Sequence, residues 1–258
     1  MNTETNAGLL SKELPREAEK GILDLAGNIV PINSDSGEEV PIAAVDSSFV
    51  VLGQDNENFY ILLRSALVFR KNQNNIRVVR SGPFLLSSES SEGHFHEMEI
   101  DNILRVNETI SNGIVLVDGL DLKEIESKLK SYHKNFLISV DKVFQFENMR
   151  VFSVFPKYPF VVNLKDNTFL ARLSPNGFIV KLSLLSSSIT EACKVLSMLI
   201  RNDELSFGYP LTLKLAHIFA KILPYEASSA RLSLYMKEKV SITRKLDGRK
   251  LLLGSLWG

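Results

Sequence analysis

Apolar and polar residues alternate along this chain of 258 residues in blocks that predict both helices and strands. Apolar positions at helical spacing over residues 13–25 predict a first helix, and residues 34–39 form a polar loop. Three β-rich segments follow, at residues 42–51, 59–69 and 76–79. Short polar segments separate them, so this part of the chain is typical of an antiparallel meander.

The pattern then alternates between helix and strand. It predicts helices at residues 97–110 and 122–132, and strands at residues 113–117 and 136–140. Three antiparallel strands, a helix and then strand–helix–strand is the order of a ribonuclease H-like sheet, in which the first and fourth strands lie side by side. Right-handed crossovers make this geometry feasible. The expected fold class is therefore α/β, with a ribonuclease H-like mixed sheet flanked by helices.

The rest of the chain predicts further elements of both kinds. Helices are expected at residues 190–200 and 211–223, and a strand pair is expected in the segment after residue 236. Four more strands are predicted, at residues 151–155, 160–163, 169–173 and 178–184. We therefore expect an N-terminal helical extension over residues 1–40, followed by one domain over residues 41–258 that ends in a helical and β extension.

Three acidic residues have a distinctive placement in this pattern. Asp46 ends the apolar run IAAVD, Asp118 ends GIVLVD, and Glu99 lies in the predicted helix between them. A carboxylate at the end of a buried strand is unfavourable unless a positive charge compensates it. Hard divalent cations prefer oxygen ligands, and phosphoryl chemistry uses them to stabilise attacking and leaving oxygens. The three acids thus indicate a divalent-metal site, although solvated turn residues and helix caps give the same pattern.

Composition narrows the class of protein. The chain is 45% hydrophobic and 23% charged, as is ordinary for a soluble globular protein. A single cysteine, Cys193, excludes an intrachain disulfide and a cysteine-rich zinc site. The polar start does not resemble a signal peptide and no apolar run approaches a membrane span, so we expect a cytoplasmic protein with no membrane partner. Neither a P-loop nor a GxGxxG motif is present, which argues against nucleoside triphosphate hydrolysis.

The formal net charge is zero, but the charges are distributed unevenly. Residues 61–80 carry five basic and no acidic residues, and residues 209–258 carry nine basic against three acidic residues. Residues 81–126 hold two basic against ten acidic residues. Basic segments beside an acidic metal pocket are compatible with a phosphate-backbone substrate. Solvated faces of mixed charge are the other interpretation.

A further motif, GYPLTLKLAH, runs from Gly208 to His217. Tyr209 precedes a proline and should be extended, so the helix begins beyond it. His217 lies among apolar residues, a pattern that also fits a histidine in a helix core. The HFHE segment at residues 94–97 has the pattern of a surface segment. Aromatic residues between positions 144 and 160 suit base stacking, although their spacing fits a sheet core better.

Together these motifs resemble those of the NurA nucleases of archaea and some bacteria. The matching segments are VDSS at Asp46, LVDG at Asp118 with Glu99 nineteen residues before it (118 − 99), and GYPLTLKLAH ending at His217. The resemblance covers residues 40–225. It implies a ribonuclease H-like fold, a DNA nuclease that depends on Mn²⁺ (or Mg²⁺), a homodimer, and a role in DNA-end resection and double-strand break repair. The implied protein partners are a HerA-type hexameric ATPase and single-strand-binding protein.

The resemblance also implies a set of site residues. Four positions match the family's catalytic metal site, namely Asp46, Glu99, Asp118 and His217, and Lys142 matches a catalytic lysine after the fifth strand. Two features depart from the family. Ser47 replaces the usual glycine after the first aspartate, and serine disfavours positive φ. Lys142 stands in VDKVF, without the expected small polar pair after it.

Two hypotheses follow from these residues. The leading one is a metal-dependent DNA nuclease in which the acids and His217 hold one or two ions. The alternative is a NurA-like paralogue with weak or no activity, which binds DNA or recruits partners. Intact acids favour the first hypothesis, and the two departures favour the second.

Overall fold

The computed structural model describes most of the chain between residues 28 and 238. The described ranges are residues 28–33, 38–54, 58–72, 75–88, 93–128, 135–141, 155–165, 167–185 and 188–238. Several predicted features lie outside them: the helix at residues 13–25, Lys142, most of the strand at residues 151–155 and the C-terminal strand pair.

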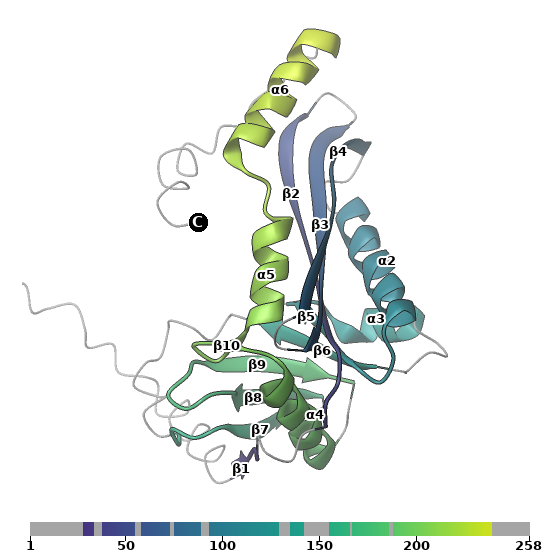
Figure 1. Ribbon diagram of the computed structural model, residues 1–258. Helices are drawn as coiled ribbons and strands as arrows, with labels where there is room; N and C mark the ends of the chain where they lie inside the picture. The colour runs from purple at the N-terminus through teal and green to yellow at the C-terminus, as the bar shows by residue number, and fades with distance from the viewer. Residues whose placement is uncertain are drawn as a thin grey trace, which may run out of the picture.

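A nine-stranded mixed sheet forms the centre of the molecule (Figure 1). Its strands are β1 Val30–Pro31, β2 Ile42–Gln54, β3 Phe59–Asn72, β4 Asn75–Ser88, β5 Ile114–Asp118, β6 Phe136–Asp141, β7 Phe160–Lys165, β8 Thr168–Arg172 and β9 Ile179–Leu184. They lie in the order β1-β7-β8-β9-β6-β5-β2-β3-β4. A small hairpin is formed by β10 Leu205–Ser206 and β11 Tyr209–Pro210. The described helices are α2 Gly93–Thr109, α3 Leu122–Lys128, α4 Ile189–Asn202, α5 Leu211–Ala220 and α6 Pro224–Glu238.

The strands β4-β3-β2-β5-β6 confirm the predicted ribonuclease H-like arrangement. The first three form the antiparallel meander. β2 then pairs in parallel with β5, and β5 pairs in parallel with β6. Antiparallel pairing of β6 with β9 continues the sheet through β8 and β7 to β1. The sheet therefore reaches back into the segment before residue 41.

Helices cover both faces of the central strands because successive strand residues point to opposite sides. Ala43 and Val45 of β2 pack with α2 and α3 in one buried cluster. Ile42 and Ala44 belong to a larger core with α4 and α5. Figure 1 shows α2 and α3 on one side of the long strands and α5 on the other. Each fully buried aliphatic side chain contributes about 1.5–3 kcal/mol to this packing.

Several elements differ from the prediction, among them β4 and the helices after β11. β4 runs over Asn75–Ser88, whereas the apolar pattern predicts only residues 76–79. Its second half contains Gly82 and Pro83, which are tolerated because β4 lies at the edge of the sheet, where a missing N–H is not needed for pairing. The helix predicted over residues 211–223 ends early, since α5 stops at Ala220, and α6, which begins at Pro224, was not predicted. Proline suits a first helical turn but not a helix interior.

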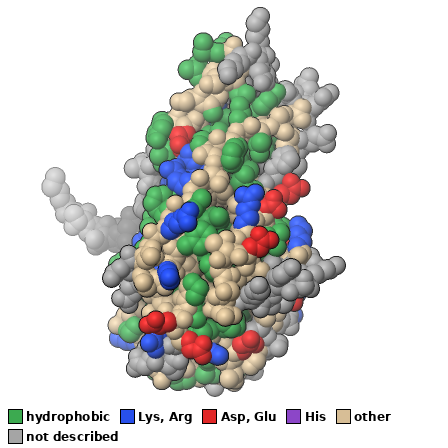
Figure 2. Space-filling view, turned by 45° about the vertical axis from the view of Figure 1, so that its right-hand side comes forward, with side chains coloured by type: hydrophobic (Ala, Val, Ile, Leu, Met, Phe, Trp, Pro, Cys, Tyr) green, Lys and Arg blue, Asp and Glu red, His purple; other side chains and the backbone are tan. Residues whose placement is uncertain are grey.

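The basic segment at residues 61–80 divides between the core and the surface. Arg64 and Arg70 of β3 are only 2% and 1% exposed and pair with acids from later elements. Lys71, Arg77 and Arg80 are exposed. On the face drawn in Figure 2, basic, acidic and hydrophobic side chains are intermixed, so this face does not carry one single-sign surface. None of the described helices combines the length and the apolar character that crossing a membrane requires.

Candidate functional site

The parallel register of β2 and β5 brings the two strand aspartates together. Val45 of β2 pairs with Val117 of β5, so Asp46 and Asp118 are the next residues on adjacent strands. Alternation places both side chains on the face of the sheet that α5 covers. Asp46 is 5% exposed and the Asp118 side chain is 19% exposed. The predicted proximity of these two acids is confirmed.

The two strands continue differently beyond the acids. β5 ends at Asp118, and Gly119 turns the chain with a φ of +65°, a conformation that favours glycine. The Gly119 N–H donates to the carbonyl of Val140 on β6 at 3.0 Å. β2 instead runs on to Gln54, so Asp46 lies within the strand, as in the predicted range of residues 42–51, and only the apolar run ends at this residue. Asp46 nevertheless lies level with the C-terminal end of the neighbouring strand, because β5 stops at Asp118 beside it.

Ser47, the departure from the family pattern, is an ordinary strand residue. It pairs with Ser65 of β3, and its φ is not positive. Its N–H donates to Oδ1 of Asp46 at 2.9 Å. The backbone at this position therefore does not require a glycine.

Helix α5 places His217 over the two aspartates. Its Nδ1 lies 2.9 Å from Oδ2 of Asp46 and 3.7 Å from Oδ2 of Asp118. An ionised carboxylate can only accept, so with such a partner the shorter contact requires the tautomer that carries a hydrogen on Nδ1. The His217 side chain is 54% exposed. It is therefore not a core histidine, although its apolar neighbours in the sequence allowed that interpretation.

Buried polar contacts fix the start of α5. Asp203, which follows α4, accepts hydrogen bonds from the N–H and Oγ1 of Thr212 at 3.1 and 2.8 Å. Arg70 of β3 reaches the same carboxylate, with Nε 3.3 Å from Oδ1. Burial raises the pKa of Asp203 to about 6, while the Thr212 hydrogen bonds and the Arg70 charge act in the opposite direction. These contacts attach the first turn of α5 to the sheet.

The end of α5 is attached to the same pair of strands. Oγ of Ser48 on β2 donates to the carbonyl of Ala220 at 2.5 Å. Nη1 of Arg64 on β3 donates to the carbonyl of Lys221 at 3.0 Å. Because both ends of α5 are held by β2 and β3, the position of His217 relative to Asp46 is defined by the sheet.

Glu99 approaches the acids from α2, on the other face of the sheet. It is 5% exposed. Burial, followed by the negative charges of Asp46 and Asp118, raises the pKa of Glu99 to about 8. Three converging carboxylates repel one another, and Glu99, which is also buried, retains its proton at neutral pH unless a cation offsets the charge.

Asp46, Asp118 and His217 fit a single cation. One donor atom from each lies within 4.8 Å of the other two. Metal–ligand distances of about 2.0–2.6 Å place donors on opposite sides of an ion roughly 4–5 Å apart, so this spacing suits one ion. Carboxylate oxygens and imidazole nitrogen together accept several divalent metals. A cation there would take the place of the Nδ1 proton and compensate the charges of Asp46 and Asp118, which add to the effect of burial on the pKa of Glu99.

Tyr209 also borders the site, although the sequence analysis did not assign it there. It is 8% exposed, and burial, then the charges of Asp118 and Asp46, raise the pKa of its phenol. The signal that could have assigned Tyr209 to the site is its place in the GYPLTLKLAH motif, which also contains His217. Lys142 follows directly after β6 but lies outside the described residues, so its role stays a prediction.

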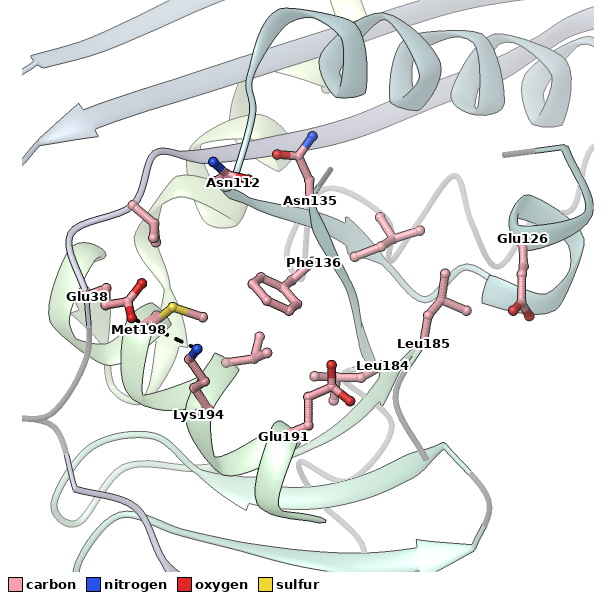
Figure 3. Close-up of a pocket in the computed structure, with 13 residues that line it drawn as sticks. Glu38, Asn112, Glu126, Asn135, Phe136, Leu184, Leu185, Glu191, Lys194 and Met198 are labelled. Atoms are coloured by element: carbon pink, nitrogen blue, oxygen red, sulfur yellow. Dashed lines mark ion pairs between the residues drawn. The ribbon is translucent and has the colours of Figure 1, made fainter. Parts of the chain in front are cut away.

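A separate pocket of about 450 Å³ lies at the opposite edge of the sheet, beside the starts of β2, β5 and β6 (Figure 3). Phe136 and Met198 contribute to its apolar lining. Glu38, Glu191 and Lys194 add charged groups, with Nζ of Lys194 3.9 Å from a Glu38 oxygen. None of the predicted site residues within the described ranges lines this pocket, so it is distinct from the cluster around Asp46.

Comparison with known proteins gives matches in structure but not in sequence. No family model matches the chain, and no curated protein matches it. The NurA nuclease from Sulfolobus solfataricus is 10% identical, with a TM-score of 0.60 over 86% of this chain and 92% of that one. A crystal structure of NurA bound to dAMP and manganese is 11% identical, with a TM-score of 0.57 over 86% of this chain and 93% of that one.

A further NurA crystal structure matches with a TM-score of 0.52, at 10% identity, over 85% of this chain and 93% of that one. The match spans nearly the whole length of each of these proteins, so it includes the strands beyond the ribonuclease H-like core. The described part of the chain therefore has the fold of the NurA nucleases.

Proposed function

We propose that this protein is a metal-dependent nuclease that acts on DNA. The observation that carries the proposal is the convergence of Asp46, Asp118 and His217 within 4.8 Å at one edge of the sheet. The NurA-like fold supports it, as does the manganese in one of the similar structures. Mn²⁺ is the proposed ion, with Mg²⁺ as the substitute that the same oxygen donors accept.

Each residue has a role in this proposal. Asp46, Asp118 and His217 would hold the ion, whose chemistry there would be to activate a water and to offset charge on the scissile phosphate. Glu99 would complete the shell or hold a second ion once it is ionised, a state that a nearby cation favours. Lys142 is proposed as an additional positive charge at the phosphate.

The wider role is proposed from the same likeness. It comprises DNA-end resection and double-strand break repair in the cytoplasm, with a HerA-type hexameric ATPase and single-strand-binding protein as partners. A homodimer is part of this proposal, with residues 1–40 as an extension to the domain at residues 41–258. Sedimentation tests the dimer: removal of residues 1–30 should give a monomer, and a full-length protein that is monomeric at micromolar concentration would rule the dimer out.

A nuclease assay on labelled linear DNA tests the central proposal. Cleavage is expected with Mn²⁺ or Mg²⁺ and is expected to stop with EDTA. Asp46→Ala should abolish it, whereas Asp101→Asn, which changes an exposed acid on α2, should leave it intact. Equal cleavage by wild type and Asp46→Ala would show that the activity comes from elsewhere.

The second candidate is a NurA-like subunit that binds DNA but cuts poorly. The departure from the family pattern after Lys142 favours it, while the ordinary strand conformation of Ser47 removes the other argument. Tight DNA binding without cleavage, in any of the divalent metals, would establish this alternative.

A further inference from the structure

Two phenylalanine rings stand exposed beside the small hairpin β10–β11. Phe207 is 77% exposed and Phe178 is 52% exposed. Their ring centroids are 6.2 Å apart and their planes are tilted by 47°. Single exposed apolar residues are common on protein surfaces, but two adjoining large rings form a patch that needs an explanation.

The backbone holds both rings in this exposed arrangement. Phe207 has a φ of +54°, which is unusual for a bulky residue, and Gly208 follows with a φ of +89°. The Phe178 N–H donates to the carbonyl of Phe207 at 2.8 Å. Gly177 packs so closely on this turn that a Cβ there would lie 3.0 Å from Cα of Gly208. The chain therefore adopts an unfavourable conformation that keeps Phe207 out of the core.

The aromatic pair lies at the same edge of the sheet as the acids. Phe178 directly precedes β9, whose Lys181 pairs with Asp141 at the end of β6. Asp118, at the end of β5, pairs with the residue of β6 that precedes Asp141. Tyr209, two residues after Phe207, lies in β11, which leads directly into α5, the helix that carries His217.

A lysine lies between the aromatic pair and His217. Nζ of Lys214 contacts Oγ of Ser206 at 2.9 Å, next to Phe207 in the hairpin. Lys214 and His217 are three residues apart on α5 and therefore share a face of the helix, and both are exposed. An aromatic surface, a cation and the donor cluster thus follow one another along this edge.

We propose that Phe178 and Phe207 form a stacking platform for an unpaired base of single-stranded DNA whose backbone passes Lys214 toward Asp46 and Asp118. Base–aromatic stacking tolerates any sequence because every base has a π-face, and neighbouring cations neutralise the phosphates. In a duplex the base faces already stack on one another, so the platform selects a single strand or an unpaired end. This inference rests on the proposed function, because it takes nucleic acid to be the substrate.

The test separates base stacking from cleavage. Fluorescence anisotropy in EDTA would measure binding of labelled oligo(dT) and of a strand of equal length with abasic sites. Wild type should prefer oligo(dT), and Phe178→Ala and Phe207→Ala should each weaken its binding on the order of 10-fold while leaving the abasic strand unaffected. Phe207→Trp should retain the preference. Phe84→Ala, on the edge strand β4 and 44% exposed, serves as the matched control with unchanged binding.

Several results would overturn the platform. The proposal is wrong if both alanine variants bind oligo(dT) and the abasic strand as tightly as wild type does. It is also wrong if wild type binds neither strand. A change in oligomeric state without loss of the base-dependent binding would reassign the pair to a protein interface. Because the binding assay is done in EDTA and does not depend on cleavage, it also tests the platform in a protein that fails to cut DNA. Conversely, if the stacking platform is disproved, the cleavage assay that compares wild type with Asp46→Ala still tests the proposed nuclease activity.

Discussion

Arg64 and Glu226 form a bidentate ion pair that joins β3 to α6, with Nη2–Oε1 and Nη1–Oε2 distances of 2.5 and 2.9 Å. Arg64 is 2% exposed and the Glu226 side chain 19% exposed. Arg64→Ala would leave Glu226 without its partner and open a cavity beside the sheet. We expect it to lower the free energy of unfolding by about 3 kcal/mol, measured by urea denaturation.

The same pair has a pH signature. The hydrogen bonds from Arg64, followed by the N–H of Leu223, lower the pKa of Glu226 to about 2. A lowered carboxyl pKa stabilises the fold above its unfolded value near 4.5, and this contribution disappears as the pH falls toward 2. The difference in stability between wild type and Arg64→Ala should therefore shrink with acidification. Lys128→Ala, which breaks the exposed pair with Glu124, is the control and should change stability by less than about 0.5 kcal/mol.

Thr212 should matter for the site although it touches neither aspartate of the cluster. Thr212→Val removes the hydrogen bond from Oγ1 to Asp203 and keeps the shape of the side chain. We expect a loss of about 1 kcal/mol in stability and weaker metal binding, because the start of α5 is less firmly held. Thr109→Val removes a comparable but exposed bond to the Arg105 carbonyl and should affect neither quantity. Unchanged metal affinity in Thr212→Val would show that His217 is positioned independently of this cap.

Divalent metal should stabilise the wild-type fold. Binding to the native state alone adds about 2.7 kcal/mol when the ion is at 100 times its Kd, which raises Tm by several degrees. Asp118→Asn should remove this shift, and its Tm without metal should equal or exceed that of wild type because one repelling charge is gone. Differential scanning fluorimetry with Mn²⁺, Mg²⁺ and EDTA measures both effects. A large loss of stability in metal-free Asp118→Asn would instead mark the acid as structural.

Glu99 predicts a pH dependence of opposite sign to that of Glu226. Its pKa is about 8 in the folded protein and ordinarily 4.5, so between these values the folded state holds a proton that the unfolded chain releases. Stability without metal should therefore fall as the pH rises from 5 to 8. Glu99→Gln should remove this decline and raise stability at pH 8 by several kcal/mol, since each unit of pKa shift corresponds to about 1.4 kcal/mol. Glu108→Gln, at an exposed position of the same helix, should leave the slope as it is in wild type.

The neighbouring placement of Asp46 and Asp118 could be predicted because it depends on the order of strands and helices. An apolar run ending in an acid marks each strand, and right-handed crossovers place the two strands side by side. The assignment of Glu99 to the site came from the family resemblance, through its spacing of nineteen residues to Asp118. These features depend on local pattern and topology, both of which the sequence carries.

Other features depend on contacts that pattern does not reveal. The apolar neighbours of His217 did not indicate which face of α5 is buried; Leu213, Ala216 and Ala220 take the core side and leave the histidine outside. The second half of β4 is a strand because it pairs with β3, although its composition is that of a loop. In the sequence, Arg64 and Arg70 have the pattern of surface charges. Their burial depends on pairing with acids from the last quarter of the chain, which the local pattern does not reveal.

The separation of 171 residues between Asp46 and His217 has a consequence during synthesis of the chain. The acids emerge from the ribosome early, on strands that cannot pair before β5 has been made, but the imidazole arrives only with α5. Asp203 and Glu226, which secure the buried arginines of β3, arrive equally late. A nascent or prematurely terminated chain thus lacks the third donor, and the full donor set becomes available only when translation has passed α5 and the helix has docked.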